Sequence, residues 1–192
     1  MKEMAERIRA EGKVYPGNIL KVDSFLNHQI DPAFMTHIGE ELYRLYQDAG
    51  VTKILTVEAS GIAIALAAAM QFGVPMVFAK KNQTSNLSPD VYSASVKSFT
   101  HNRVYQIVVA KQYLSPDDRV LIVDDFLAQG NAILGLMDLL KQAGAAVAGV
   151  GIGVEKGFQE GGRLIRGMGV RVESMAVVDS IADGTITLRD EN

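Results

Sequence analysis

The residues best suited to do chemistry are two adjacent carboxylates, Asp124 and Asp125, which come directly after the apolar run 120–123. An uninterrupted run of Val, Leu, Ile and Val is expected of a strand that is buried on both faces of a parallel sheet. A short loop, 126–130, then leads into a stretch from Ala132 that is compatible with a helix. Carboxylates at such a point can accept hydrogen bonds from sugar hydroxyls or hold a water bound to magnesium.

The loop before this helix has the features of a phosphate site. The first amide N–H groups of a helix lack partners within it, and the helix dipole places partial positive charge there. Gly130 lets the backbone come close to a phosphate, while Ala128 and Ala132 keep bulky side chains away. One loop could therefore hold both ends of a ribose 5-phosphate. The residues alone also allow a simpler interpretation, in which the two aspartates only end a strand and cap a helix.

Strands and helices alternate around this run, which predicts an α/β fold with a doubly wound, mostly parallel sheet in a single domain, 1–192. Asp31 followed by Pro32 marks the start of a helix that ends near Gly50. The expected strands are 52–57, 74–79, 104–110, 120–123 and 147–154, with a further helix over 62–72.

Two more segments suggest a binding crevice. Residues 58–61 form a second strand-to-helix loop, and ligands of open α/β sheets bind at the carboxyl ends of the strands. A routine turn with Ser60 as helix N-cap explains the same residues. Residues 80–100 are polar with few apolar anchors before Tyr92, which is typical of a mobile lid or of an ordinary surface hairpin.

Composition excludes several classes of function. A net charge of −3 gives no broad basic field for nucleic acid, and the absence of cysteine excludes disulfides, thiolate catalysis and Cys-ligated zinc. No stretch reaches the roughly 20 apolar residues of a membrane span, and the charged segment 1–11 is unlike a signal peptide. The loop 126–130 matches neither a dinucleotide nor a P-loop motif. We expect a cytoplasmic protein that binds neither nucleic acid nor membranes.

The run 119–132, RVLIVDDFLAQGNA, resembles the motif that binds phosphoribosyl diphosphate (PRPP) in type I phosphoribosyltransferases. The resemblance implies that a nitrogenous base displaces pyrophosphate from PRPP with the help of Mg²⁺, and that Asp124 and Asp125 are catalytic residues at the ribose hydroxyls. This loop lacks the Thr that is commoner in the family, so backbone amides must bind more of the phosphate. The implied PRPP-binding residues are Ala128, Gln129, Gly130, Asn131 and Ala132.

The same resemblance gives roles to the other loops. A lid of about 80–105 would close over PRPP and exclude water. No zinc site is expected, because His28 and His37 show no paired Asp, Glu or His ligand spacing. No protein side chain is assigned as a direct ligand of the Mg²⁺ that accompanies PRPP. The implied pyrophosphate-binding residues are Ala59, Ser60, Gly61, Lys80 and Lys81.

Residues 20–32 resemble the hood of bacterial xanthine phosphoribosyltransferases, and 155–159 and 171–174 extend the resemblance along nearly the whole chain. It implies a hood built from 1–35 and the C-terminal part, a homodimer, and transfer to N9 of xanthine, giving xanthosine 5′-monophosphate. Xanthine has two exocyclic oxygens, which suit the donors of an amide and an ammonium, whereas adenine needs acceptors. The implied xanthine-binding residues are Leu20, Asn27, Lys156 and, as an aromatic platform, Phe158.

Two alternatives stay open. The first is an enzyme of the same fold that uses hypoxanthine, guanine or orotate. The second is a PRPP-sensing regulator without catalysis, which usually needs a nucleic-acid-binding module or a basic face that this acidic chain does not offer.

Overall fold

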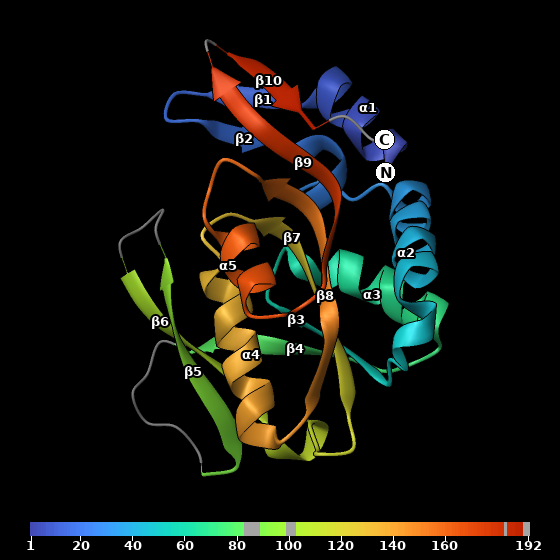
Figure 1. The fold of residues 1–192 in the computed structure, drawn as a ribbon, viewed down its shortest axis with the longest axis vertical. Helices are drawn as coiled ribbons and strands as arrows, with labels where there is room; N and C mark the ends of the chain where they lie inside the picture. Colours follow the sequence, from blue (N-terminus) through green and yellow to red (C-terminus); the bar gives the residue numbers. More distant parts are fainter. Residues whose placement is uncertain (83–88, 99–102, 183, 190–192) are drawn as a thin grey trace.

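The computed structural model describes residues 1–82, 89–98, 103–182 and 184–189. An eight-stranded sheet with the order β10-β9-β8-β7-β3-β4-β6-β5 runs through it (Figure 1). The links from β4 through β3, β7 and β8 to β9 are parallel, and those that add β6, β5 and β10 are antiparallel. This confirms the predicted α/β fold with a mostly parallel sheet.

The strands of this sheet are β3 (Lys53–Val57), β4 (Met76–Asn82), β5 (Val91–Ser98), β6 (Arg103–Ala110), β7 (Arg119–Leu127), β8 (Ala146–Lys156), β9 (Val172–Ala182) and β10 (Thr185–Leu188). The helices are α1 (Lys2–Glu11), α2 (Pro32–Tyr46), α3 (Gly61–Phe72), α4 (Asn131–Ala143) and α5 (Gly161–Gly167), with single turns η1 (Asp23–Asn27), η2 (Gln47–Ala49) and η3 (Lys111–Tyr113). A separate hairpin joins β1 (Lys13–Tyr15) to β2 (Ile19–Lys21).

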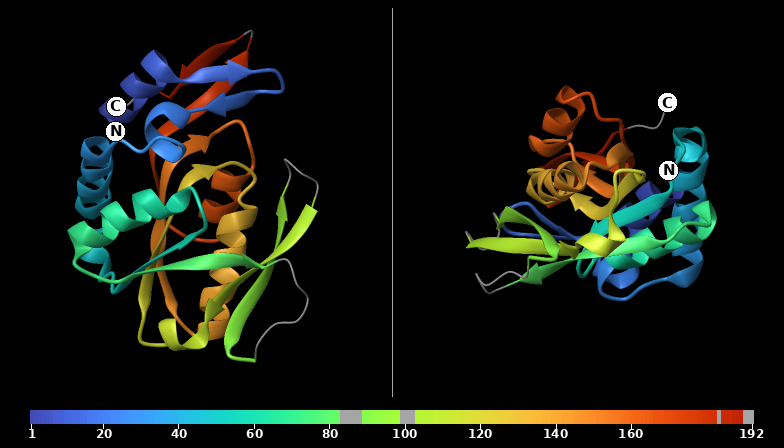
Figure 2. Two further views of the ribbon diagram at one scale, coloured as in Figure 1. Left: turned by 180° about the vertical axis from the view of Figure 1, so that it is seen from behind. Right: turned by 90° about the horizontal axis from the view of Figure 1, so that it is seen from below.

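Helices cover both faces of the sheet: α4 and α5 lie on one side, α2 and α3 on the other (Figure 2). The side chains of β7 show why both faces of the sheet are covered. Val120 and Ile122 pack with the α4 side chain Leu136, whereas Leu121 and Val123 pack with the α2 side chain Leu42. Alternate residues of a strand face opposite sides of a sheet, so a continuous apolar run serves two hydrophobic layers.

Residues 1–31 lie beside β9 and β10 at one end of the molecule, and we call this end the hood (Figure 1). The N-terminal ammonium donates to the Met175 carbonyl at 2.7 Å, which ties α1 to β9. The Asp31 side chain accepts hydrogen bonds from the amides of Ala33 and Phe34, so the predicted start of α2 is confirmed. No helix within the described ranges is long and apolar enough to cross a membrane.

Three predicted strand ends are too early, by two residues in β8, which ends at Lys156, and by more in β7 and β4. β7 continues past Val123 to Leu127, because its parallel partner β8 continues beside it, and Asp124 and Phe126 take part in the pairing. The aspartates therefore lie inside a strand and not in a loop after it. β4 likewise runs on to Asn82, where it pairs with β6.

The predicted lid is a packed hairpin where the structure describes it. β5 pairs with β6 over its whole length, and Ala94, Val96 and Ile107 are buried against α4. A Cβ at Gly135 of α4 would lie 2.6 Å from a Val96 methyl carbon, which shows how closely helix and hairpin meet. The hairpin alternative thus describes 91–98 and 103–105, while 83–88 and 99–102 lie outside the described residues. Closure over a ligand stays a prediction.

Tyr46 anchors α2 to the sheet. Its buried hydroxyl donates to the Val150 carbonyl at 2.8 Å, and the Arg171 guanidinium lies 4.7 Å from the ring centroid. Burial raises the pKa of Tyr46, so the hydroxyl keeps its proton. Glycine is needed at position 149, because a Cβ there would lie 2.3 Å from a carbon of the tyrosine ring.

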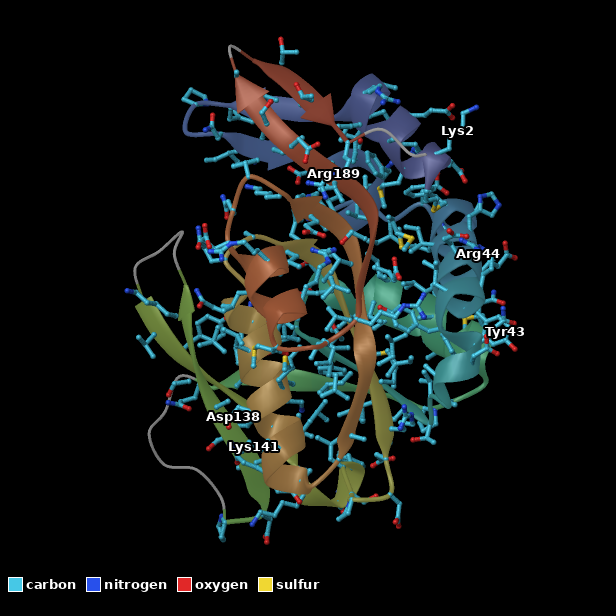
Figure 3. The ribbon with its side chains drawn as sticks, viewed as in Figure 1. Lys2, Tyr43, Arg44, Asp138, Lys141 and Arg189 are labelled. Carbon is cyan, nitrogen blue, oxygen red and sulfur yellow. The ribbon has the colours of Figure 1, made fainter. Side chains whose placement is uncertain are left out.

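Replacing Tyr46 with Phe should destabilise the protein by about 1 kcal/mol, because a buried hydrogen bond is lost while the ring stays in place. The melting temperature should fall by roughly 2–4 °C, as expected for a chain of this size. The control is Tyr43→Phe, whose side chain lies on the outer side of α2 (Figure 3) and is exposed. Equal melting temperatures for wild type and Tyr46→Phe would contradict this role.

Candidate active site

A cavity of about 530 Å³ lies at the carboxyl ends of β7 and β8. Its volume is typical of sites for small molecules. The hood contributes the turn between β1 and β2, and the β5–β6 hairpin contributes the opposite wall. The lining residues are Gly17, Asn18, Ile19, Val96, Lys97, Tyr105, Phe126, Leu127, Ala128, Gln129, Gly130, Asn131, Ala132, Ile133, Lys156 and Gln159.

The five residues predicted to bind the PRPP phosphate, 128–132, all line this cavity, and we call them the PRPP loop. Gly130 has a φ of 84° and caps α4, a conformation that glycine adopts without strain. The Asn131 side-chain amide donates to the Lys97 carbonyl at 3.0 Å, so it fastens the loop to β5. The amides of the first turn of α4 have no acceptor within the helix, and they are the donors that a phosphate would meet.

Asp124 and Asp125 are buried next to this loop, with only 5% and 7% of their surfaces exposed. The Asp125 carboxylate accepts a hydrogen bond of 2.8 Å from the side-chain amide of Asn27 in the hood. Burial, and then the charge of Asp125, raise the pKa of Asp124 well above its ordinary value, with Lys81 acting weakly against them. An approaching cation or hydroxyl donor would favour the ionised form of this carboxyl.

The second loop meets the aspartates at Gly61, the first residue of α3. A Cβ at this position would lie 2.1 Å from the Thr56 hydroxyl oxygen and 2.7 Å from a carboxylate oxygen of Asp124. Only glycine therefore fits, and loop 58–61 and the aspartates lie at one place, as the sequence predicts. Ser60 occupies the N-cap position without a side-chain cap hydrogen bond, so the capping alternative lacks its characteristic contact. The peptide bond between Glu58 and Ala59 is cis.

The two lysines of β4 lie at different places. The Lys81 ammonium lies 5.4 Å from the ring centroid of Tyr105, which lines the cavity. Lys80 lines a separate apolar cavity together with Phe78 and Tyr113. Neighbouring residues of a strand point to opposite faces, so the structure brings Lys81 to the site and leaves Lys80 outside it.

On the base side, Lys156 lies in the cavity, 6.0 Å from the ring centroid of Phe126. Burial lowers the pKa of its ammonium. Phe158, the predicted platform, is 38% exposed and is not among the lining residues. The Leu20 side chain is buried in the hood core, and Leu20 is not among the lining residues either.

Ten of the lining residues were not predicted, among them Phe126, Gln159, Lys97 and Tyr105. Phe126 could have been found, because in a strand that continues past Asp125 it lies on the same face as Asp124. Gln159 contacts the PRPP loop through Gln129, with 3.4 Å between the two amides. Lys97 and Tyr105 come from the distant β5–β6 hairpin, and no local pattern indicated that it packs beside the PRPP loop.

The comparisons with known proteins agree with this geometry. The phosphoribosyl transferase domain family matches residues 26–165. The chain is 52% identical, over the full length of both proteins, to a xanthine phosphoribosyltransferase of Lachnoclostridium phytofermentans. It is also 52% identical to one of Bacillus cytotoxicus, covering 97% of this chain and 95% of the relative. In fold it resembles the adenine phosphoribosyltransferase of Giardia lamblia complexed with 9-deazaadenine, with a TM-score of 0.75, 24% identity, and 89% and 95% of the two chains covered.

Replacing Asp124 with Asn should stabilise the protein at pH 8. Because folding raises the pKa of this carboxyl, its contribution to stability is fully present below the ordinary pKa and is lost as the pH rises. The amide imitates the protonated form, so the melting temperature should rise by about 2–4 °C, the shift that about 1 kcal/mol produces. The gain should shrink towards pH 4 in thermal unfolding followed by circular dichroism.

The matched change is Asp138→Asn on α4 (Figure 3), where the side chain is exposed. It should give no gain that depends on pH. An Asp124→Asn variant that melts below wild type at pH 8 would contradict the effect of burial on this carboxyl.

Proposed function

Because the chain belongs to the phosphoribosyl transferase domain family, we propose that it transfers the 5-phosphoribosyl group of PRPP to N9 of xanthine, which gives xanthosine 5′-monophosphate and pyrophosphate. The chain is an enzyme of purine salvage. One observation carries the proposal: the PRPP loop and Lys156 line the same cavity, so donors for a phosphate and a donor for a base face one space.

The two substrates take different walls of the cavity. The 5-phosphate lies on the amides at the start of α4, and the ribose hydroxyls lie towards Asp124 and Asp125. The diphosphate is held by the amides of Ser60 and Gly61 together with Lys81. Lys80 is left out, because it faces the other cavity.

Xanthine lies on the Lys156 side. The Lys156 ammonium donates to an exocyclic oxygen, and Phe126 gives the ring a stacking surface next to it. Asn27 has two amide hydrogens, of which one is used on Asp125, so the other can donate to the second oxygen. Phe126 thus takes the role that was predicted for Phe158, and no contact with the base is proposed for the buried Leu20 side chain.

The reaction exchanges one bond at the anomeric carbon of the ribose. The bond to pyrophosphate breaks, the bond to N9 forms, and the proton of N9 leaves to solvent. Positive charge develops on the sugar as pyrophosphate departs, and the carboxylates of Asp124 and Asp125 stabilise it from a desolvated position. No side chain is assigned as general base, because xanthine loses a proton easily.

The donor set fits a magnesium ion that arrives with PRPP. Within the described residues no group of three or more His, Asp or Glu side chains is placed to hold a metal ion. Magnesium usually keeps several of its waters, so substrate phosphates would bind the ion while the adjacent Asp124 and Asp125 would hold its bound waters. When bound, the ion neutralises charge on the diphosphate.

That the protein forms a homodimer and lies in the cytoplasm stays a prediction.

A panel of radiolabelled bases with PRPP and Mg²⁺ tests the proposal. We expect the highest kcat/KM for xanthine and much lower values of kcat/KM for guanine and hypoxanthine. If guanine greatly outperformed xanthine, the base assignment would fail while the reaction class stands. Binding of PRPP without turnover of any base would favour the regulator.

The same panel checks the role of Lys156. Lys156→Met should lower kcat/KM for xanthine by about tenfold or more, because a hydrogen bond from a charged donor is worth roughly 1.5–3 kcal/mol. The matched control is Lys141→Met on the outer side of α4 (Figure 3), which should behave as wild type. Equal activity of the two variants on xanthine would remove Lys156 from the base site.

Replacing Asp124 and Asp125 together with Asn should reduce turnover by about two orders of magnitude or more, because neutral amides cannot stabilise the developing charge. The initial rate of xanthosine 5′-monophosphate formation measures this, with Asp138→Asn as the control. Near-normal turnover in the double variant would exclude both carboxylates from the mechanism.

A further inference from the structure

The start of α5 touches the PRPP loop through backbone alone. The Gly161 amide donates to the Ala128 carbonyl at 3.0 Å. A Cβ at Gly161 would lie 2.4 Å from that carbonyl oxygen and 2.6 Å from the Gly130 nitrogen. From the other side, a Cβ at Gly130 would lie 3.1 Å from the Gly161 Cα atom. The backbones of these two segments are therefore in direct contact, and no side chain lies between them.

An ion pair between a buried carboxylate and a partly exposed guanidinium fixes α5 in this place. The Arg166 guanidinium donates two hydrogen bonds, of 2.7 and 2.8 Å, to the carboxylate of Glu155 at the end of β8. The Ser174 hydroxyl of β9 adds a third hydrogen bond to the same carboxylate, at 2.5 Å. Glu155 is only 3% exposed, and a Cβ at Gly162 would lie 1.9 Å from its oxygen, so the helix lies directly on this carboxylate.

The Glu155 carboxylate keeps its charge beside Arg166, and the ion pair has a defined geometry. Burial alone would raise the pKa of Glu155, but the hydrogen bonds from Arg166 and Ser174 outweigh it and lower the pKa, so the carboxylate stays charged. Two parallel hydrogen bonds from a planar guanidinium set the angle as well as the distance between two groups. The helix α5 therefore has little freedom to move relative to β8.

We propose that Arg166 and Gly161 are positioning residues for the PRPP loop: the ion pair between Arg166 and Glu155 holds α5 so that Gly161 supports the backbone of the loop from behind. This inference rests on the proposed function, since it assigns the loop to the 5-phosphate. Asn131 fastens the opposite side of the loop to β5. A phosphate would then meet amides that are already arranged, and misplacing reacting groups by about 1 Å can cost on the order of a hundredfold in rate.

The end of β8 that carries Glu155 also contributes a residue to the part of the cavity proposed to bind the base. Lys156 follows Glu155 in β8, and neighbouring residues of a strand point to opposite faces. Glu155 points to α5 while Lys156 lines the cavity. One strand end thus carries the support of the phosphate loop and the donor to the base, which keeps the two half-sites at a fixed separation.

Gly161→Ala tests the proposal, with Gly167→Ala on the same helix as the control, because a Cβ at Gly167 meets nothing within 4 Å. In Gly161→Ala the added methyl group displaces the PRPP loop. We expect KM for PRPP to rise about tenfold or more and ribose 5-phosphate to bind correspondingly weaker in calorimetry. KM for xanthine should change by less than about threefold, and Gly167→Ala should leave both constants as in wild type.

The outcomes separate two claims. If KM for PRPP in Gly161→Ala stays within about twofold of wild type, or if both constants rise equally, Gly161 does not position the loop and the inference is overturned. If wild type itself binds neither PRPP nor ribose 5-phosphate, the proposed function fails instead. A folded variant is recognised by its circular dichroism spectrum.

If Gly161→Ala does not fold, a second variant tests whether the ion pair positions the PRPP loop. In Glu155→Gln/Arg166→Gln both partners become neutral together, so no single charge is left buried without a partner. We expect a rise of about threefold or more in KM for PRPP and faster hydrogen exchange of the amides of the PRPP loop. The control is Arg163→Gln, which breaks the exposed pair with Glu160 on the same helix. Unchanged KM and exchange in the double variant would overturn the role of the ion pair.

Discussion

The parallel pairing of β7 with β8 is the constraint on which the site depends. It continues beyond the apolar part of β7, as far as Leu127 opposite Glu155. Asp124 and Asp125 are therefore held in backbone hydrogen bonding and lose most of their contact with water, which gives charge interactions at this point more weight than they have at a surface. The same pairing places Phe126 and Lys156 in one cavity. The acidic part of the site is therefore held by strand pairing and does not belong to a loop.

Glycines join this sheet edge to the segments around it. Gly61 brings α3 against the Asp124 carboxylate, and Gly161 brings α5 against the PRPP loop, at distances that exclude any side chain. Backbone amides therefore surround the place where phosphates are expected. This arrangement suits a substrate that must be held tightly at two phosphate groups and released after reaction, because fixed dipoles need no reorganisation when charge develops.

The sequence predicts much of this arrangement and misses a definite part of it. Apolar runs located four of the five parallel strands, β3, β4, β7 and β8, and missed β9. The Asp31–Pro32 signal located the start of α2. The run 119–132 predicted the loop that lines the cavity and the two acids next to it, because strand, acids and small residues are adjacent in the chain. The strand ends were misplaced, since charged residues such as Asp124 normally end a strand and only the partner β8 carries the pairing on.

Contacts between distant segments leave no local pattern in the sequence. The resemblance implied that 80–105 lies over PRPP, but no pattern in the sequence indicated that this hairpin packs on α4 or that α5 supports the PRPP loop. The most direct test of the central claim is a crystal structure of the protein with PRPP and Mg²⁺. The account predicts the 5-phosphate on the amides of residues 128–132 and the ribose hydroxyls against Asp124 and Asp125; PRPP bound at any other place in the molecule would contradict it.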